Sequence, residues 1–231
     1  MLLFSSLLCA LIIVASAQAR IADVTAGDRF RYGDFVATWN TNDPNYATPS
    51  FLQDYNNTVW LEIIVESVIG PNITASMTIL FRNGTTTNFG GLIDVDTGDS
   101  VNLTNYFISS GLYQGDQLYT STSPNTTINE TTTRNFAGGS REVNRFDTVQ
   151  TNYSEDYYWD RITGAALENS YSEVNRTGDY ETTLSLFTEI VDTNVWTITP
   201  ETFTWASILL TLILLVPTVT LVHRRKLSQM K

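Results

Sequence analysis

The chain has 231 residues, of which 42% are hydrophobic and 16% charged, and its net charge is −11 at pH 7. All 24 Asp and Glu lie between Arg20 and Glu201, where nine Arg and no Lys oppose them, so this region carries −15. Such an acidic surface excludes binding to nucleic acid or to anionic lipid headgroups, because it cannot neutralise their negative charge.

The same region also lacks His and Cys, because the only Cys of the chain is Cys9 and the only His is His223. This excludes Ser-His-Asp and Cys-His catalysis, Schiff-base chemistry and ordinary zinc sites. Disulfides are excluded as well, and we predict no catalytic residue, no cofactor and no metal site. Carboxylates, Arg, Tyr and Trp remain, and these could support glycoside hydrolysis or the binding of hard cations.

Residues 1–19 are typical of a secretory signal peptide. An apolar run over residues 7–14 precedes the small-residue pattern Ala17-Gln18-Ala19, which predicts cleavage before Arg20. The apolar run is too short to span a bilayer comfortably. We therefore expect the mature chain to begin outside the cell.

Residues 20–199 are predicted to form one extracellular β domain. Apolar and polar residues alternate in "DRFRYGDFVATW", "WLEIIVESVIG", "ITASMTILFRNG" and "TTLSLFTEIVD", and Asn83-Gly84 suits a tight hairpin turn. Clusters of Gly, Asn, Asp or Pro separate these segments. We predict an all-β, antiparallel meander of seven to ten strands that forms a curved sheet or half-barrel, with a two-sheet sandwich as the alternative.

Two segments depart from this alternation. The apolar residues of "LTNYFISSGLYQG", residues 103–115, fit a short helix or a loop that plugs one face of the sheet. The most polar stretch is "TSTSPNTTINETTTR", residues 120–134, for which we predict a long surface loop or an edge strand.

The segment "YYWDRITGAALENS", residues 157–170, has two interpretations. Tyr153, Tyr157 and Trp159 alternate with polar residues, and "RITG" ends in Gly164, as expected for a β-hairpin with cross-strand aromatic pairs. The alternative is the floor of a sugar-binding active site. Glycosidase chemistry would need two carboxylates about 5–10 Å apart, one of them with a raised pKa. The candidate acids are Glu155, Asp156, Asp160 and Glu168, with Tyr157 and Trp159 as sugar platforms.

Two further charged motifs have competing interpretations. "DVDTGDS", residues 94–100, could be a weak calcium site between Asp94 and Asp99, but Gly98 stands one place too early for a calcium loop and favours a hairpin turn. Arg141 and Arg145 flank Glu142 and are interpreted as paired surface charges rather than as an anion site.

The region is also rich in N-x-Ser/Thr sequons, which predict a glycan-coated surface protein. A Thr- and Asn-rich β protein could equally produce these sequons by chance. The eight candidate N-glycosylation sites are Asn56, Asn72, Asn83, Asn102, Asn125, Asn129, Asn152 and Asn175.

The C-terminal end predicts a single membrane span. The segment from Phe203 to Val222 is uncharged for twenty residues, which is long enough to cross a hydrocarbon core as a helix. Trp205 suits the outer interface, and "HRRK" follows directly on what would be the cytoplasmic side. We assign residues 200–222 to a transmembrane helix and residues 223–231 to a cytoplasmic tail.

Four motifs carry a resemblance to known proteins: "AGDRFRY", "GLIDVDTGD", "GSREVN" and above all "YYWDRITGAALENS". With them the chain resembles a group of uncharacterised archaeal cell-surface proteins. That resemblance implies a signal peptide, an all-β ectodomain and a C-terminal single-span anchor, with no catalytic residues. The last motif is also similar to bacterial envelope β-proteins of the lipoprotein-carrier type, whose curved sheet can hold an apolar ligand.

These observations predict a membrane-anchored extracellular binding or structural module of the cell surface that is not an enzyme. Its expected partner is a protein or glycan at the cell surface. One alternative is a carboxylate-based glycoside hydrolase. Another is a carrier or sensor of an apolar ligand in the concave face, lined by Leu61, Ile63, Met77, Ile79 and Leu186.

Overall fold

The computed structural model describes residues 20–120 and 126–196. The predicted signal peptide, membrane span and cytoplasmic tail lie outside these residues. Within them, no helix has the length and apolar character needed to cross a membrane. The described part is all-β, as predicted, with α1 (Phe51–Asn57) as its single helix.

Ten strands make up this part of the chain, and they agree with the upper end of the predicted number. They are β1 (Arg29–Thr41), β2 (Thr58–Ile69), β3 (Asn72–Phe81), β4 (Thr86–Asp94), β5 (Ser100–Val101), β6 (Glu130–Phe136), β7 (Gly139–Val149), β8 (Tyr153–Asp160), β9 (Ala166–Thr177) and β10 (Tyr180–Thr193).

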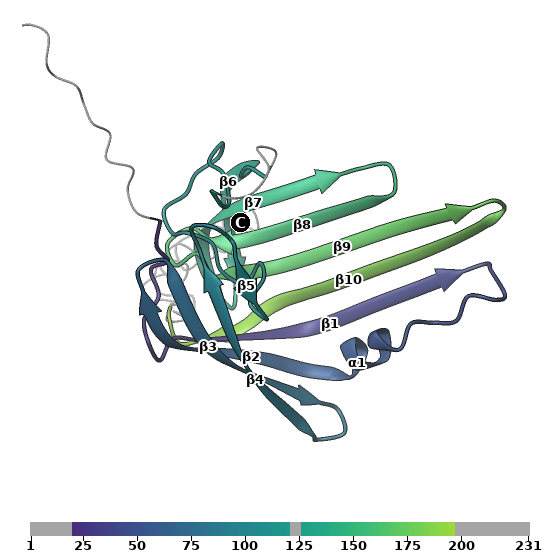
Figure 1. Ribbon diagram of the computed structural model, residues 1–231, viewed down its shortest axis with the longest axis horizontal. Coiled ribbons are helices and arrows are strands. Elements are labelled where there is room, and N and C mark those ends of the chain that lie inside the picture. Colours follow the sequence, from purple (N-terminus) through teal and green to yellow (C-terminus); the bar gives the residue numbers. More distant parts are fainter. Residues whose placement is uncertain (1–19, 121–125, 197–231) are drawn as a thin grey trace, which may run out of the picture.

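All ten strands belong to one antiparallel sheet, in the order β5-β4-β3-β2-β1-β10-β9-β8-β7-β6 (Figure 1). The order consists of two meanders, β1 to β5 and β6 to β10, which are joined where β1 pairs with β10. The sheet does not close, since β5 and β6 stand at its two ends. The alternative of a two-sheet sandwich is therefore wrong for this domain.

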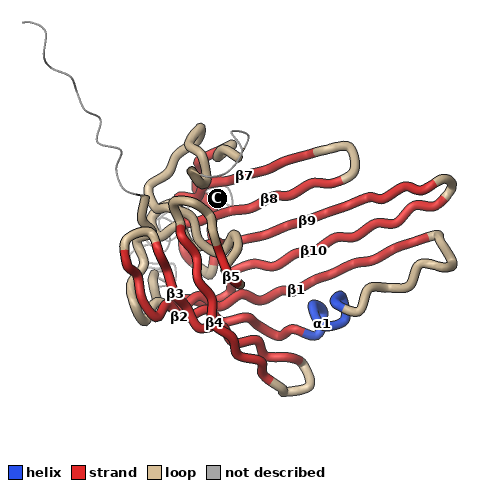
Figure 2. The backbone as a smooth tube through the Cα atoms, viewed as in Figure 1, coloured by secondary structure: helices blue, strands red, loops and turns tan. Residues whose placement is uncertain are grey.

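The sheet is joined over a short length only between β1 and β2, within the first meander. β1 pairs with β10 from Phe30 to Thr41 but with β2 only from Arg29 to Tyr32. Beyond Tyr32, β1 and β2 diverge, and Figure 2 shows α1 in the space between their outer parts. This divergence gives the two halves of the sheet different directions in Figure 1.

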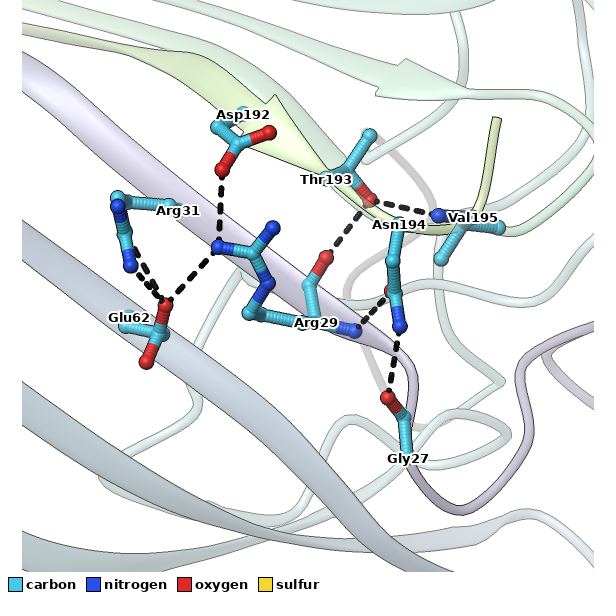
Figure 3. Close-up of polar contacts among 8 residues, drawn as sticks. All are labelled: Gly27, Arg29, Arg31, Glu62, Asp192, Thr193, Asn194 and Val195. Carbon is cyan, nitrogen blue, oxygen red and sulfur yellow. Dashed lines mark hydrogen bonds and ion pairs between the residues drawn. The ribbon is translucent and has the colours of Figure 1, made fainter. Parts of the chain in front are cut away.

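Charged side chains reinforce the junction between the two meanders (Figure 3). Arg29 on β1 contacts Glu62 on β2 at 3.2 Å and Asp192 on β10 at 2.8 Å. Arg31 adds a contact of 2.6 Å to the same Glu62 carboxylate. At the end of the strand, the backbone N–H of Arg29 donates to Oδ1 of Asn194 at 2.7 Å. These contacts fix β1 to both of its neighbours where the sheet divides.

The core fills the angle between the two halves of the sheet. Loop residues 102–119 cross it and bury Leu103, Phe107 and Ile108 against the strands. The rings of Phe30 and Phe107 meet edge to face at 5.6 Å. The segment 103–115 is therefore a loop that plugs one face of the sheet, one of its two predicted forms, and not a helix.

The outer parts of β1, β8, β9 and β10 extend beyond this core as a single layer (Figure 1). On β9 the first two residues are buried, whereas residues 168–174 are all partly exposed with no alternation. A strand with one fully covered face would alternate, so neither face of this part of β9 is fully covered. Cross-strand pairs and ion pairs must hold it together.

The predicted hairpins are confirmed. β3 and β4 are joined through Asn83-Gly84, where Gly84 has φ +83°. β8 and β9 pair from Tyr153 onward, so "YYWDRITGAALENS" is a hairpin. Residues 130–134 of the polar stretch belong to the edge strand β6, while residues 121–125 lie outside the described part.

Candidate functional site

The strongest candidate site lies on the core side of the sheet, near the base of the outer strands. We call this side of β1, β8, β9 and β10 the inner face; it carries Tyr32, Thr188, Asn169 and Tyr157. Thr188 pairs with Asn169, and Asn169 pairs with Tyr157. Because paired residues of neighbouring strands project to the same side of a sheet, these three side chains form one row.

A cavity of about 130 Å³ opens above this row. The loop over residues 102–119 forms its other wall, so the cavity depends on segments far apart in the sequence. It is lined by Tyr32, Thr104, Asn105, Tyr106, Tyr157, Ala166, Glu168, Asn169 and Thr188.

The aromatic walls of the cavity are fixed by hydrogen bonds and ring contacts. The hydroxyl of Tyr32 donates to the carbonyl of Ala166 at 3.0 Å, and its ring meets Tyr106 edge to face at 5.2 Å. Tyr157 stacks on Trp159 at 5.4 Å with 12° between the ring planes. Nε1 of Trp159 in turn donates to the carbonyl of Asn105 at 2.8 Å. The site is therefore largely preformed.

Two amides stand beside the hydroxyl of Tyr157, and one of them has an acceptor without a partner among the described residues. Burial raises the pKa of Tyr157, and the amides of Asn105 and Asn169 partly oppose this rise. Oδ1 of Asn169 is buried and finds no hydrogen-bond partner among the described residues. An unsatisfied buried acceptor costs about 1–3 kcal/mol, which a donor from water or from a bound ligand would recover.

Asp160, the best placed of the candidate acids, has a structural role. Its side chain is fully buried, and the guanidinium of Arg141 donates to it twice, at 2.7 and 2.9 Å. The backbone N–H and the hydroxyl of Thr163 also donate to Oδ1 of Asp160, which fixes the turn between β8 and β9. Arg141 is thus not the surface charge that the sequence predicted, because it reaches inward to this carboxylate.

Two other candidate acids are paired in the same way. Asp156 accepts two hydrogen bonds from Arg145, at 2.8 and 3.0 Å. Glu168 contacts Arg134 at 3.3 Å, and Arg134 lies over the ring of Tyr158 at 4.0 Å. Burial raises the pKa of Glu168, whereas Arg134 lowers it.

Glu155 is the remaining candidate acid, and burial raises its pKa. It alternates with Asp156 along β8, so it shares the inner face with Tyr157, while Asp156 and Tyr158 lie on the opposite face. Glu168 pairs with Tyr158 across the strands and its carboxylate meets Arg134 there, although the residue also lines the cavity beside Tyr157. Asp156 and Asp160 do not line this cavity. The four acids therefore do not converge on one groove around Tyr157 and Trp159.

The "DVDTGDS" motif is a hairpin turn between β4 and β5, as the position of Gly98 predicted. Oδ1 of Asp94 accepts the backbone N–H groups of Asp96 at 2.8 Å and Thr97 at 3.0 Å, and Gly98 has φ +84°. Over residues 20–120 and 126–196, no group of three or more His, Cys, Asp or Glu is arranged to hold a metal ion.

The residues predicted to line an apolar cavity lie elsewhere. Leu61, Ile63 and Met77 are buried in the core, where the plug loop packs, and Ile79 contacts the same core. Leu186 lies on the inner face of the outer strands, paired with Tyr171. None of these five residues lines the cavity above the Asn169 row.

The sequons are exposed wherever the structure describes them. Seven of the eight asparagines fall in this part of the chain, and Asn125 lies outside it. Whether any of them carries a glycan stays a prediction.

Comparison with known proteins adds no family. No family model, no curated protein and no solved structure matches the chain. The resemblance to archaeal surface proteins and to lipoprotein carriers therefore stays a prediction, and the function must be argued from the site.

Sequence reasoning identified Tyr157 and Glu168 but missed Asn105, Tyr106 and Asn169. Asn is frequent in this chain, so a single Asn in a loop or strand carries no signal of its own. Only the placement of the plug loop over β9 brings the two amides together.

Proposed function

We propose that this protein is a membrane-anchored extracellular binding module of the cell surface, and that the cavity on its inner face takes a small, uncharged, hydroxyl-rich ligand such as a sugar. The observation that carries the proposal is the buried Oδ1 of Asn169, which lacks a donor among the described residues. Asn169 lines a cavity whose other walls are tyrosines, threonines, Asn105, Ala166 and Glu168.

The chemistry of the cavity favours such a ligand over other small molecules. A sugar ring offers C–H faces to aromatic side chains and hydroxyl groups at its rim. Tyr157 and Tyr106 provide aromatic surface, while Asn105, Asn169 and Thr188 provide donors and acceptors. Sites of this composition, with a few fixed polar groups between aromatic walls, are typical of ligand binding.

The membrane anchor is supported by the sequence. The uncharged segment over residues 203–222 and the basic residues directly after it fit one span with the ectodomain outside. The curved half-barrel form of the sheet belongs to the same proposal, since an open, bent sheet presents its inner face to ligands. Separation of membranes at high pH tests the anchor: the chain is expected in the membrane pellet, and its release into the supernatant would contradict the span.

Calorimetric titration of the full-length chain in detergent with a panel of neutral mono- and disaccharides tests the ligand. We expect Asn169→Leu to weaken binding about tenfold or more, because the ligand loses a hydrogen bond to a buried acceptor. Ser172→Ala serves as the matched control, since Ser172 lies on the opposite face of β9 from Asn169. This variant is expected to bind the ligand normally. Equal affinity of Asn169→Leu and the unmodified chain, or no heat with any saccharide, would contradict the proposal.

A further inference from the structure

The inner face continues outward from the cavity as an ordered set of side-chain rows. Beyond the row of Thr188, Asn169 and Tyr157, the next row pairs Ala37, Leu186, Tyr171 and Glu155. The following row pairs Trp39, Leu184, Glu173 and Tyr153 across the same four strands. We call these two rows the outer track. It carries three aromatic side chains, three aliphatic ones and two carboxylates.

The opposite face of the same strands has a different composition. On β8 and β9 it carries Ser154, Ser170 and Ser172. Ser154 pairs with Ser172 across the strands, and Ser170 pairs with Asp156. Beyond the cavity, the aromatic side chains of β8 and β9, Tyr153 and Tyr171, thus lie on the inner face, whereas β10 places Phe187 on the opposite face. This asymmetry is what a ligand-binding face requires and what a sheet serving only as a spacer would not need.

A second, smaller pocket of about 90 Å³ closes the far end of the outer track. The loop after β1 folds Tyr46 back so that it stacks on Trp39 at 5.6 Å, with 15° between the rings. Nε1 of Trp39 is buried and finds no hydrogen-bond partner in the described ranges. The pocket is lined by Trp39, Tyr46, Glu173, Asn175, Thr182 and Leu184.

The charges on the outer track are negative. Glu173 accepts a hydrogen bond from the hydroxyl of Tyr171 at 2.7 Å and keeps further acceptor capacity. Arg145 on β7 and Arg134 on β6 are paired with Asp156 and Glu168 on the opposite face. The track therefore repels anions, and it offers acceptors to hydroxyl or ammonium donors.

We propose that the outer track is the continuation of the ligand site, and that it binds a short oligosaccharide without negative charge, which runs along β9 from the cavity to the Trp39–Tyr46 stack. The inference rests on the proposed function, because it places one end of the sugar chain in the cavity. Asn169 and Glu173 are four residues apart on β9, so the two pockets lie about 13 Å apart along the strand.

An extended peptide fits this face less well. Peptides that bind sheets add to an edge strand, where backbone N–H and C=O groups are free. On β9 and β10 the backbone groups are already paired with strands on both sides. Side chains alone face the ligand here, and these are aromatic rings and carboxylates, which suit the C–H faces and hydroxyl groups of sugars.

The test is titration of the full-length chain in detergent with N-acetylated chito-oligosaccharides of one to six units. We expect affinity to rise with length and then level off once both pockets are filled. We expect Trp39→Ala to weaken binding of the longer oligomers about tenfold or more, and the same loss for Tyr46→Ala in the more exposed loop. Neither variant should change binding of the monosaccharide. Thr38→Ala, on the opposite face of β1, is the matched control.

Charge and ligand class are tested with the same preparation. The de-N-acetylated, positively charged oligomers should bind at low salt, and oligogalacturonates of equal length should not. Length-independent binding of saccharides would overturn the outer track and leave the cavity proposal standing. Length-dependent binding that needs Trp39, without monosaccharide binding, would support the track and refute the cavity as its starting point. Tighter binding of a basic peptide than of any saccharide would overturn the inference.

Discussion

The side-chain amide of Asn56 pairs with both backbone groups of Ala37. Oδ1 of Asn56 accepts from the Ala37 N–H at 2.7 Å, and Nδ2 donates to the Ala37 carbonyl at 2.9 Å. Ala37 lies on β1 beyond the point where β2 diverges, so this edge of β1 has lost its neighbouring strand. The amide at the end of α1 takes the place that a residue of β2 would otherwise fill.

Removing this amide should open the edge of β1 locally. For Asn56→Ala we expect a loss of about 1 kcal/mol in the free energy of unfolding, because both hydrogen bonds are exposed to solvent. Hydrogen exchange of the Ala37 amide should become faster, whereas the neighbouring variant Asn57→Ala should leave it protected. Unchanged exchange at Ala37 in Asn56→Ala would show that the pairing contributes nothing.

The same pairing predicts that Asn56 stays unglycosylated although it begins a sequon. A glycan on Nδ2 makes a secondary amide, which prefers the trans form and places the sugar on the same side as Oδ1. That position holds the hydrogen that Asn56 donates to Ala37. The cis form costs about 2.5 kcal/mol. Glycopeptide mass spectrometry of the full-length chain, expressed in a glycosylating host, should find more modification at the exposed Asn152 than at Asn56. Equal occupancy of the two sites would contradict this prediction.

Asp160→Asn should destabilise the fold rather than remove an activity. The substitution leaves Arg141 without its buried partner, and breaking such a pair costs about 3–5 kcal/mol. Denaturant unfolding measures the loss. Glu181→Gln is the matched control, because it breaks the pair with Arg176 on the surface and should cost no more than about 1 kcal/mol. Similar losses in the two variants would refute the structural role of Asp160.

Gly164→Ala should be the more damaging of two glycine substitutions. Gly164 has φ +77°, and a Cβ there would overlap the carbonyl oxygen of Ile108 in the plug loop. We expect a loss of about 2–4 kcal/mol from backbone strain and overpacking together. Gly178 has φ +63° with open space around it, so Gly178→Ala should cost about 1–2 kcal/mol. Thermal unfolding of both variants compares them, and equal losses would refute the contact.

The pH dependence of stability should identify Glu155 as an acid whose ionised form is disfavoured in the folded state. Burial raises its pKa in the folded state above the unfolded value, so the folded state holds its proton to higher pH. Stability contributed by this group therefore falls as pH rises from the unfolded pKa through the folded pKa. As the pH rises through this range, Glu155→Gln should gain stability relative to the unmodified chain in denaturant titrations. A constant difference across this range contradicts the assignment.

Local segments of the fold were predictable from the sequence. Alternation in residues 73–81 and the turn at Asn83-Gly84 act over neighbouring residues, and the hairpin from Tyr153 to Thr177 follows from the same local pattern. The absence of His, Cys and Lys between Arg20 and Glu201 also restricts the chemistry of this domain by composition alone.

The tertiary structure alone decided how these segments combine. Alternation shows that a strand has two faces, but it does not show which strand lies next to it. The sequence therefore left open whether β1 pairs with β10 and whether the strands form one sheet or two. The hydrogen bond from Tyr32 to Ala166 joins residues 134 positions apart, and the cavity forms only because the plug loop then covers Asn169. Contacts of this kind depend on the packing of the whole chain, which no local pattern records.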